Sequence, residues 1–196
     1  MRIPFSTALD GNVALCWGVT EIVINRAPFL TLWASVVARR LGYDEDEALT
    51  LGRAISGLTA QSKGRNLGIF TPSSEEAREK VRADREEMGA GTVEMMDRII
   101  PCVKTDDGIR ALSKAAPIDP ARVRKYLAGR FKDALPEVEG KLFVLAHTFT
   151  PDELNGAAMD VYMRLRPNVP RGREGWGKAG VLQIDRIDAL IRERSS

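Results

Sequence analysis

The sequence predicts an all-α protein, an irregular bundle of seven or eight helices with a short β element near the N-terminus. Two observations support this class. Apolar residues recur at three- and four-residue intervals over most of the chain. Helical patterns do not alternate with strand patterns, and strand character is confined to residues 12–24. With 196 residues, of which 44% are hydrophobic, the chain is long enough to bury one core.

The first predicted helix covers residues 25–41. Asn25 is a favourable N-cap, Pro28 suits the first turn, and Gly42 follows as a stop signal. Its apolar stripe, at helical spacing, consists of Phe29, Trp33, Val36, Val37 and Leu41.

The second predicted helix begins at Asp44 and ends near residues 62–64. Glu47 follows Asp44 by three residues, as in a capping box. Gly52 and Gly57 each lower helix stability by about 1 kcal/mol relative to alanine. We therefore expect a neighbouring helix to approach closely at both glycines.

The middle of the chain is more polar. Residues 71–88 predict an exposed helix capped by Ser73 or Ser74, with a disordered linker as the alternative. After a glycine break, the apolar residues from Val93 to Ile100 predict a short helix that ends before Pro101.

Residues 119–166 predict three further helices, which open at Asp119, Pro136 and Thr150, and a last short helix starts at Asp185. The chain thus divides into an N-terminal segment and hairpin (1–70), a charged helix or linker (71–90) and a C-terminal helical part (91–196). We expect these three segments to form one compact unit.

Residue usage argues against several classes of site. The chain has one histidine, His147, and two cysteines, Cys16 and Cys102, too few and too scattered for a zinc site or a disulfide framework. Asp106 and Asp107 precede a glycine and are typical of a turn and a cap. We therefore predict no catalytic residues, no metal site and no cofactor.

Location and charge follow from composition. The first residues lack the apolar stretch of a signal peptide, and no apolar run reaches the ~18 residues that span a bilayer. We expect a cytoplasmic protein with no membrane contact. The net charge is +2, but residues 161–196 hold eight basic and four acidic residues.

The segment RGREGWGKAG, residues 171–180, contains spacings close to a Walker A loop and to a dinucleotide-binding loop. Both motifs require a preceding strand, and two prolines in residues 167–170 exclude a central strand there. What remains is a basic loop around a tryptophan that can stack a base, with a solvated loop anchored by the same tryptophan as the alternative. Its candidate anion-binding residues are Arg164, Arg166, Arg171, Arg173, Trp176 and Lys178.

Two more cations, Lys63 and Arg65, lie where the second helix ends. They complement the helix dipole there. The alternative is that they join the basic loop in a single anion-binding or nucleic-acid-binding site.

Residues 37–55, VARRLGYDEDEALTLGRAI, resemble the helix-turn-helix of DNA-binding regulators, with Ala38 and Gly42 at the turn. The resemblance implies a recognition helix that presents its first residues to DNA. Here those residues are Asp44, Glu45, Asp46 and Glu47, whose carboxylates would repel phosphate. An antiparallel hairpin is the better interpretation.

Three functional hypotheses follow. The first is a non-enzymatic interaction or regulatory module that binds a protein partner or a second copy of itself, with the 164–178 loop contacting a polyanion. The second is a nucleic-acid-binding protein. The third is an enzyme whose arginine-lined pocket holds an anionic small molecule.

Overall fold

The computed structural model describes residues 20–66, 68, 73–170 and 177–195. Its helices are α1 (Arg26–Arg40), α2 (Glu45–Asn66), α3 (Glu75–Glu87), α4 (Pro120–Phe131), α5 (Leu135–His147), α6 (Pro151–Leu165) and α7 (Asp185–Ser195), with a 3-10 turn, η1 (Lys132–Ala134). Its strands are β1 (Glu21–Asn25), β2 (Gly91–Met95), β3 (Arg98–Thr105), β4 (Gly108–Ser113), β5 (Ala116–Pro117) and β6 (Ala179–Gln183).

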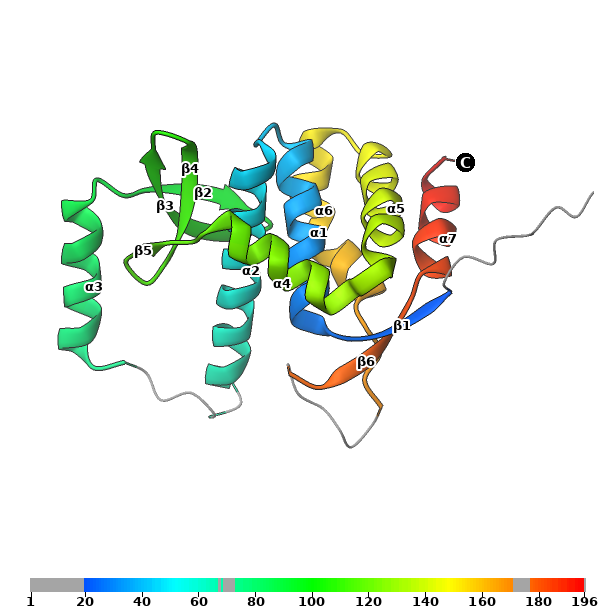
Figure 1. The fold of residues 1–196 in the computed structure, drawn as a ribbon, viewed down its shortest axis with the longest axis horizontal. Coiled ribbons are helices and arrows are strands. Elements are labelled where there is room, and N and C mark those ends of the chain that lie inside the picture. The colour runs from blue at the N-terminus through cyan, green and yellow to red at the C-terminus, as the bar shows by residue number, and fades with distance from the viewer. Residues whose placement is uncertain (1–19, 67, 69–72, 171–176, 196) are drawn as a thin grey trace, which may run out of the picture.

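Helix α1 is the centre of the helical body. Every residue from Pro28 to Ala38 is buried, because α2, α4, α5 and α6 all pack against this helix (Figure 1). The indole N–H of Trp33 donates to the carbonyl of Ala158 in α6 at 2.8 Å. The largest fully buried side chain among the described residues therefore has a hydrogen-bond acceptor for its polar group. Gly42, with φ +102°, ends the helix as predicted.

Gly52 is the point of closest approach between α1 and α2. A Cβ at this position would lie 2.3 Å from the Ser35 hydroxyl oxygen and 2.5 Å from the Thr31 carbonyl oxygen. The prediction of a close helix neighbour is therefore confirmed at Gly52. At Gly57 it is wrong, since a Cβ there would meet no atom within 4 Å.

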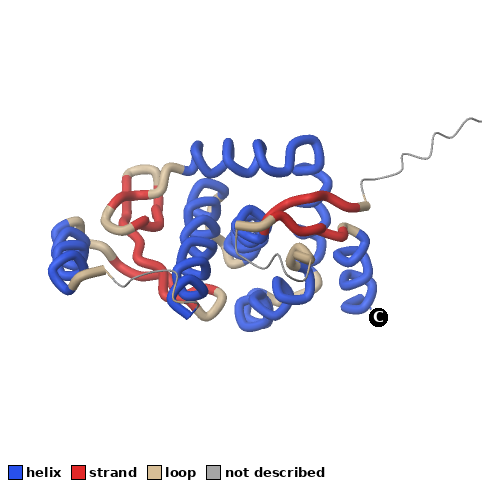
Figure 2. Tube along the Cα trace, turned by 90° about the horizontal axis from the view of Figure 1, so that it is seen from below, coloured by secondary structure: helices blue, strands red, loops and turns tan. Residues whose placement is uncertain are grey.

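The all-α prediction is wrong, and so is the description of the chain as a helical bundle. Strands β2, β3, β4 and β5 form an antiparallel sheet in sequence order, and β1 pairs with β6 in a second sheet. In Figures 1 and 2 the larger sheet lies at the left of the helical body, with α3 beyond it, and in Figure 1 the β1–β6 ribbon runs along the lower edge of the helical body. The protein is a mixed α and β structure.

The short helix predicted between Val93 and Ile100 is a β-hairpin. Its turn is formed by Met96 and Asp97, both with positive φ, as a type I′ turn requires. Met96 is fully buried and its N–H donates to the Asn155 side-chain oxygen at 3.0 Å, which offsets the strained backbone. No β4 residue pairs with Pro101, so its missing N–H breaks no bond to that strand.

The β1–β6 ribbon fulfils part of the predicted N-terminal β element. Asn25 pairs with Ala179 and Glu21 with Gln183; residues 12–19 lie outside the described chain. Gly180 allows a second close approach, because a Cβ there would lie 2.5 Å from the Asn168 carbonyl. A dinucleotide-binding loop is followed by a helix, whereas strand β6 begins here at Ala179, before the last glycine of the 171–180 segment.

The capping signals of α3, α4 and α6 were accurate, but the predicted side-chain cap of α1 is wrong, because Asn25 precedes the helix without a capping hydrogen bond. The Asp119 carboxylate accepts from the Ala121 N–H, and Ser74 caps α3. Thr150 and Glu153 form the predicted capping box of α6. Helix α3 has no buried residue, as expected for residues 71–88.

No helix in the described part of the chain is long and apolar enough to cross a membrane.

We predict that Gly52→Ala lowers the free energy of unfolding by about 3 kcal/mol, because the methyl group collides with backbone as well as side-chain atoms. Urea denaturation followed by circular dichroism measures this. Gly57→Ala is the matched control on the same helix, and it should be neutral or stabilise by up to about 1 kcal/mol. Equal effects of the two substitutions would contradict close packing at Gly52.

Candidate functional site

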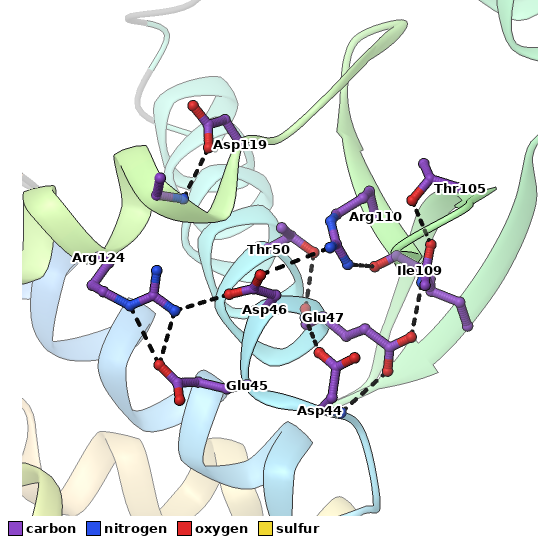
Figure 3. A network of polar contacts seen from close by, with 12 residues as sticks. Asp44, Glu45, Asp46, Glu47, Thr50, Thr105, Ile109, Arg110, Asp119 and Arg124 are labelled. Carbon is purple, nitrogen blue, oxygen red and sulfur yellow. Dashed lines mark hydrogen bonds and ion pairs between the residues drawn. The ribbon is translucent and has the colours of Figure 1, made fainter.

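An acidic network surrounds the N-terminal end of α2 (Figure 3). The Glu47 carboxylate accepts from the Ile109 N–H at 2.8 Å and from the Asp44 N–H at 3.2 Å, and Asp44 in turn accepts from the Glu47 N–H at 2.8 Å. The predicted capping box is present, and Glu47 also binds the first residues of β4. Gly108 makes room for it, since a Cβ there would lie 2.7 Å from the Glu47 oxygen.

Thr50 and Arg110 continue this network inward. The Thr50 hydroxyl, on a residue with no exposed surface, donates to the Glu47 carbonyl and accepts from the Ala111 N–H at 3.1 Å. Arg110 is 6% exposed and lies 3.9 Å from the Asp46 carboxylate. These contacts join the larger sheet to α2.

An open hollow of about 760 Å³ lies beside the network and is lined mainly by Asp44, Glu45, Asp46, Asp107, Arg110 and Asp119. Arg124 binds Glu45 and Asp46, each at 2.9 Å, and Asp119 caps α4. Most of the carboxylates therefore have structural partners. The first turn of α2 is occupied by these contacts and is not a surface on which a DNA base could be recognised. Within the described ranges, no three Asp, Glu, His or Cys side chains are placed to hold a metal ion.

Basic residues gather at the other end of the α1–α2 hairpin. Arg26 begins α1, and its Nε donates to the Pro167 carbonyl just after α6, at 3.3 Å. The Ser56 hydroxyl donates to the Ala27 carbonyl and ties α2 to the first turn of α1. Asn25 pairs with Ala179, so the backbones of the next residues along the two segments, Arg26 and Lys178, lie near the same end of the β1–β6 ribbon. In Figure 1 these segments meet at the lower side of the molecule.

Lys63 belongs to the same group. Its pKa is lowered, first by partial burial and then by the charges of Arg166 and Arg26. Cations from α1, α2 and the end of α6 therefore lie close enough to repel one another. Arg26 and Arg166 form no ion pair with any residue that the structure describes. We call Arg26, Lys63, Arg166 and Lys178 the basic face.

Helix electrostatics account for part of the basic face. Lys63 lies in the last turn of α2 and Arg166 is the C-cap of α6, where cations complement the helix dipole. Arg26 is different, because it sits at the positive end of α1. That first turn holds no acidic residue, and the Asn25 side chain forms no capping hydrogen bond.

Tyr162 lies against the first turns of α1. Its ring stacks on Phe29 with centroids 6.1 Å apart, and the residue is 1% exposed. The hydroxyl finds no hydrogen-bond partner among the described residues. Burial raises the pKa of Tyr162 to about 12, although the charges of Arg26 and Arg166 act in the opposite direction. The hydroxyl is therefore a protonated donor near those two cations.

The predicted site residues separate into groups. Lys63 and Arg166 lie close together, and Lys178 lies just before β6 at the end of the ribbon nearest Arg26. Arg65 is an exposed residue in the last turn of α2. Arg164 is bound by Glu193 at 2.6 Å and is neutralised. The others, Arg171, Arg173 and Trp176, lie outside the described residues.

The sequence interpretation missed Arg26 and Tyr162. Arg26 directly follows the N-cap Asn25, which is an unfavourable position for a cation, and that signal was available. Tyr162 lies at helical spacing with the other buried residues of α6, so its position in the sequence indicates packing alone. His147 is the last residue of α5, and its ring packs on Phe143 with centroids 4.2 Å apart, as expected for a structural role.

Comparison with known proteins adds no family. No protein-family model, no curated protein and no solved structure matches the chain.

We predict that Glu47→Ala lowers the free energy of unfolding by about 1–3 kcal/mol, because the Ile109 N–H loses its acceptor in a partly buried position. Thermal and urea denaturation measure the change. Glu45→Ala, which removes an exposed partner of Arg124, should cost less than about 1 kcal/mol. If both variants unfold at the same denaturant concentration, Glu47 does not join the sheet to α2.

We predict that Tyr162 destabilises the folded state at high pH. Its pKa is higher in the folded protein, about 12, than its ordinary value of 10.0, so its contribution is complete below pH 10 and is lost as the pH rises to 12. The loss is roughly 2–3 kcal/mol. Urea titrations at pH 9 to 12 should show a smaller loss for Tyr162→Phe than for the wild type, with Cys102 ionising in both proteins. Parallel curves would contradict the burial of the hydroxyl.

Proposed function

We propose that this protein is a non-enzymatic binding module that contacts the phosphate backbone of a single-stranded nucleic acid through its basic face. One observation supports this most: cations from three separate chain segments gather where α1 begins and where α2 and α6 end. In the described structure, no carboxylate neutralises Arg26 or Arg166.

Polyanion binding explains why such a cluster is kept. Close cations repel one another, and bringing them together lowers stability unless an anion is bound. Phosphate groups neutralise them and release counterions, which is the main source of affinity for nucleic acids. The sequence between Pro170 and Gly177 adds two arginines and a tryptophan, residue types that bind phosphate and stack on bases.

The opposite end of the hairpin favours one orientation. The acidic hollow repels phosphate, so the electrostatic field is positive at one end of α2 and negative at the other. A nucleic acid would approach from the basic end. We further propose that the protein acts in the cytoplasm, where single-stranded nucleic acid is accessible.

Fluorescence anisotropy with a labelled single-stranded oligonucleotide tests this function. The dissociation constant should rise steeply between 50 and 200 mM salt, by about 0.7 logarithmic units per logarithmic unit of salt for each phosphate neutralised. The double variant Arg26→Ala/Arg166→Ala should bind more weakly and should reduce that slope by roughly 1 to 2.

The control removes the same charge elsewhere. Arg78→Ala/Arg82→Ala lies on the exposed helix α3, where both arginines form ion pairs with neighbouring glutamates. This variant should retain the wild-type affinity and slope. Absence of binding at 50 mM salt, or the same salt slope in both double variants, would rule out the proposed function.

A further inference from the structure

Two buried polar atoms near the start of α1 lack partners within the described residues: the Tyr162 hydroxyl and the side-chain oxygen of Asn25. An unpaired buried polar group costs free energy in the folded state, and native proteins satisfy nearly all of them. A pair of such atoms beside unneutralised cations indicates a place for a ligand that supplies the missing partners.

The contacts place these groups together. Tyr162 packs on Phe29, one turn into α1, and the Arg166 N–H donates to the Tyr162 carbonyl at 2.7 Å. Arg26 binds the carbonyl of Pro167, the residue after Arg166. The charges of Arg26 and Arg166 both act on the pKa of Tyr162, so both side chains lie in the neighbourhood of its buried hydroxyl.

The same position is the N-terminal end of a 15-residue helix whose first turn has no side-chain cap. Backbone N–H groups at such an end favour an anion. Asn25, the N-cap, can rotate its amide by 180° and present Nδ2 as a donor, since the two orientations occupy the same space.

We propose that this position is a subsite for a terminal phosphate group, a phosphate monoester, with Arg26, Arg166 and the Tyr162 hydroxyl as its donors. A monoester carries close to two negative charges and three terminal oxygens, which match two guanidinium groups and one hydroxyl. An internal diester carries one charge and is extended on both sides, so it cannot reach a hydroxyl that lies below the surface.

The inference rests on the proposed function, because the phosphate belongs to the end of the bound nucleic acid. It adds a distinction that the basic face alone does not make. Internal phosphates contact the exposed cations, whereas only an end phosphate contacts Tyr162.

The first experiment uses inorganic phosphate as the probe. At matched ionic strength, phosphate should raise the melting temperature of the wild type more than chloride does, and isothermal titration should give a saturable affinity. Tyr162→Phe removes only an unpartnered hydroxyl, so this variant should fold with an equal or higher melting temperature. Its dissociation constant for phosphate should be about ten-fold higher than that of the wild type. Tyr126→Phe, on α4, is the matched control and should behave as the wild type does.

The second experiment compares one oligonucleotide with a 5′-phosphate, a 3′-phosphate or no terminal phosphate. One phosphorylated form should bind the wild type about ten-fold more tightly than the unphosphorylated form, and Tyr162→Phe should abolish this preference while salt-dependent binding persists. Equal binding of all three forms, or an equal preference in Tyr162→Phe, would overturn the subsite and leave the proposed function intact. Saturable phosphate binding that depends on Tyr162, without oligonucleotide binding, would overturn the proposed function and retain the subsite.

Discussion

The close contact between α1 and α2 at Gly52 sets the rest of the structure. Without a side chain at this position, the two helices approach until the glycine lies against the Thr31 carbonyl and the Ser35 side chain. The approach makes α1 the buried axis around which α4, α5 and α6 pack. It also fixes where the two ends of α2 lie, and both groups of charged residues depend on those ends.

The two ends of α2 have opposite charge for a physical reason. Its N-terminal carboxylates complement the positive end of the helix dipole, and they also hold Arg110, Arg124 and the N–H of Ile109. Its C-terminal cations complement the negative end, but there Lys63 lies near two further cations, Arg166 and Arg26. Several carboxylates of the acidic end thus have partners within the protein, whereas Arg26 and Arg166 at the basic end form no ion pair with a described residue.

The larger sheet shows where sequence reasoning failed. Its first turn uses Met96 and Asp97 at positive φ, without the Asn-Gly pair that normally marks a hairpin, and Pro101 argued against a strand. The second turn carried a signal, Asp106 and Asp107 before a glycine, which was interpreted as a turn and a cap but not as the turn of a hairpin. Tertiary contacts stabilise the hairpin: Met96 is buried, and its N–H donates a hydrogen bond to the side chain of Asn155, 59 residues later in the chain.

The sequence by itself determined the helices whose ends are capped locally. Gly42 after α1, the Asp44–Glu47 box of α2 and the Thr150–Glu153 box of α6 act within a few residues, so their effect is visible without a fold. Only the tertiary structure decided the sheets and the basic face. Strand pairing and charge proximity join residues far apart in the chain, as Asn25 with Ala179 or Lys63 with Arg166, and no local pattern encodes such distances.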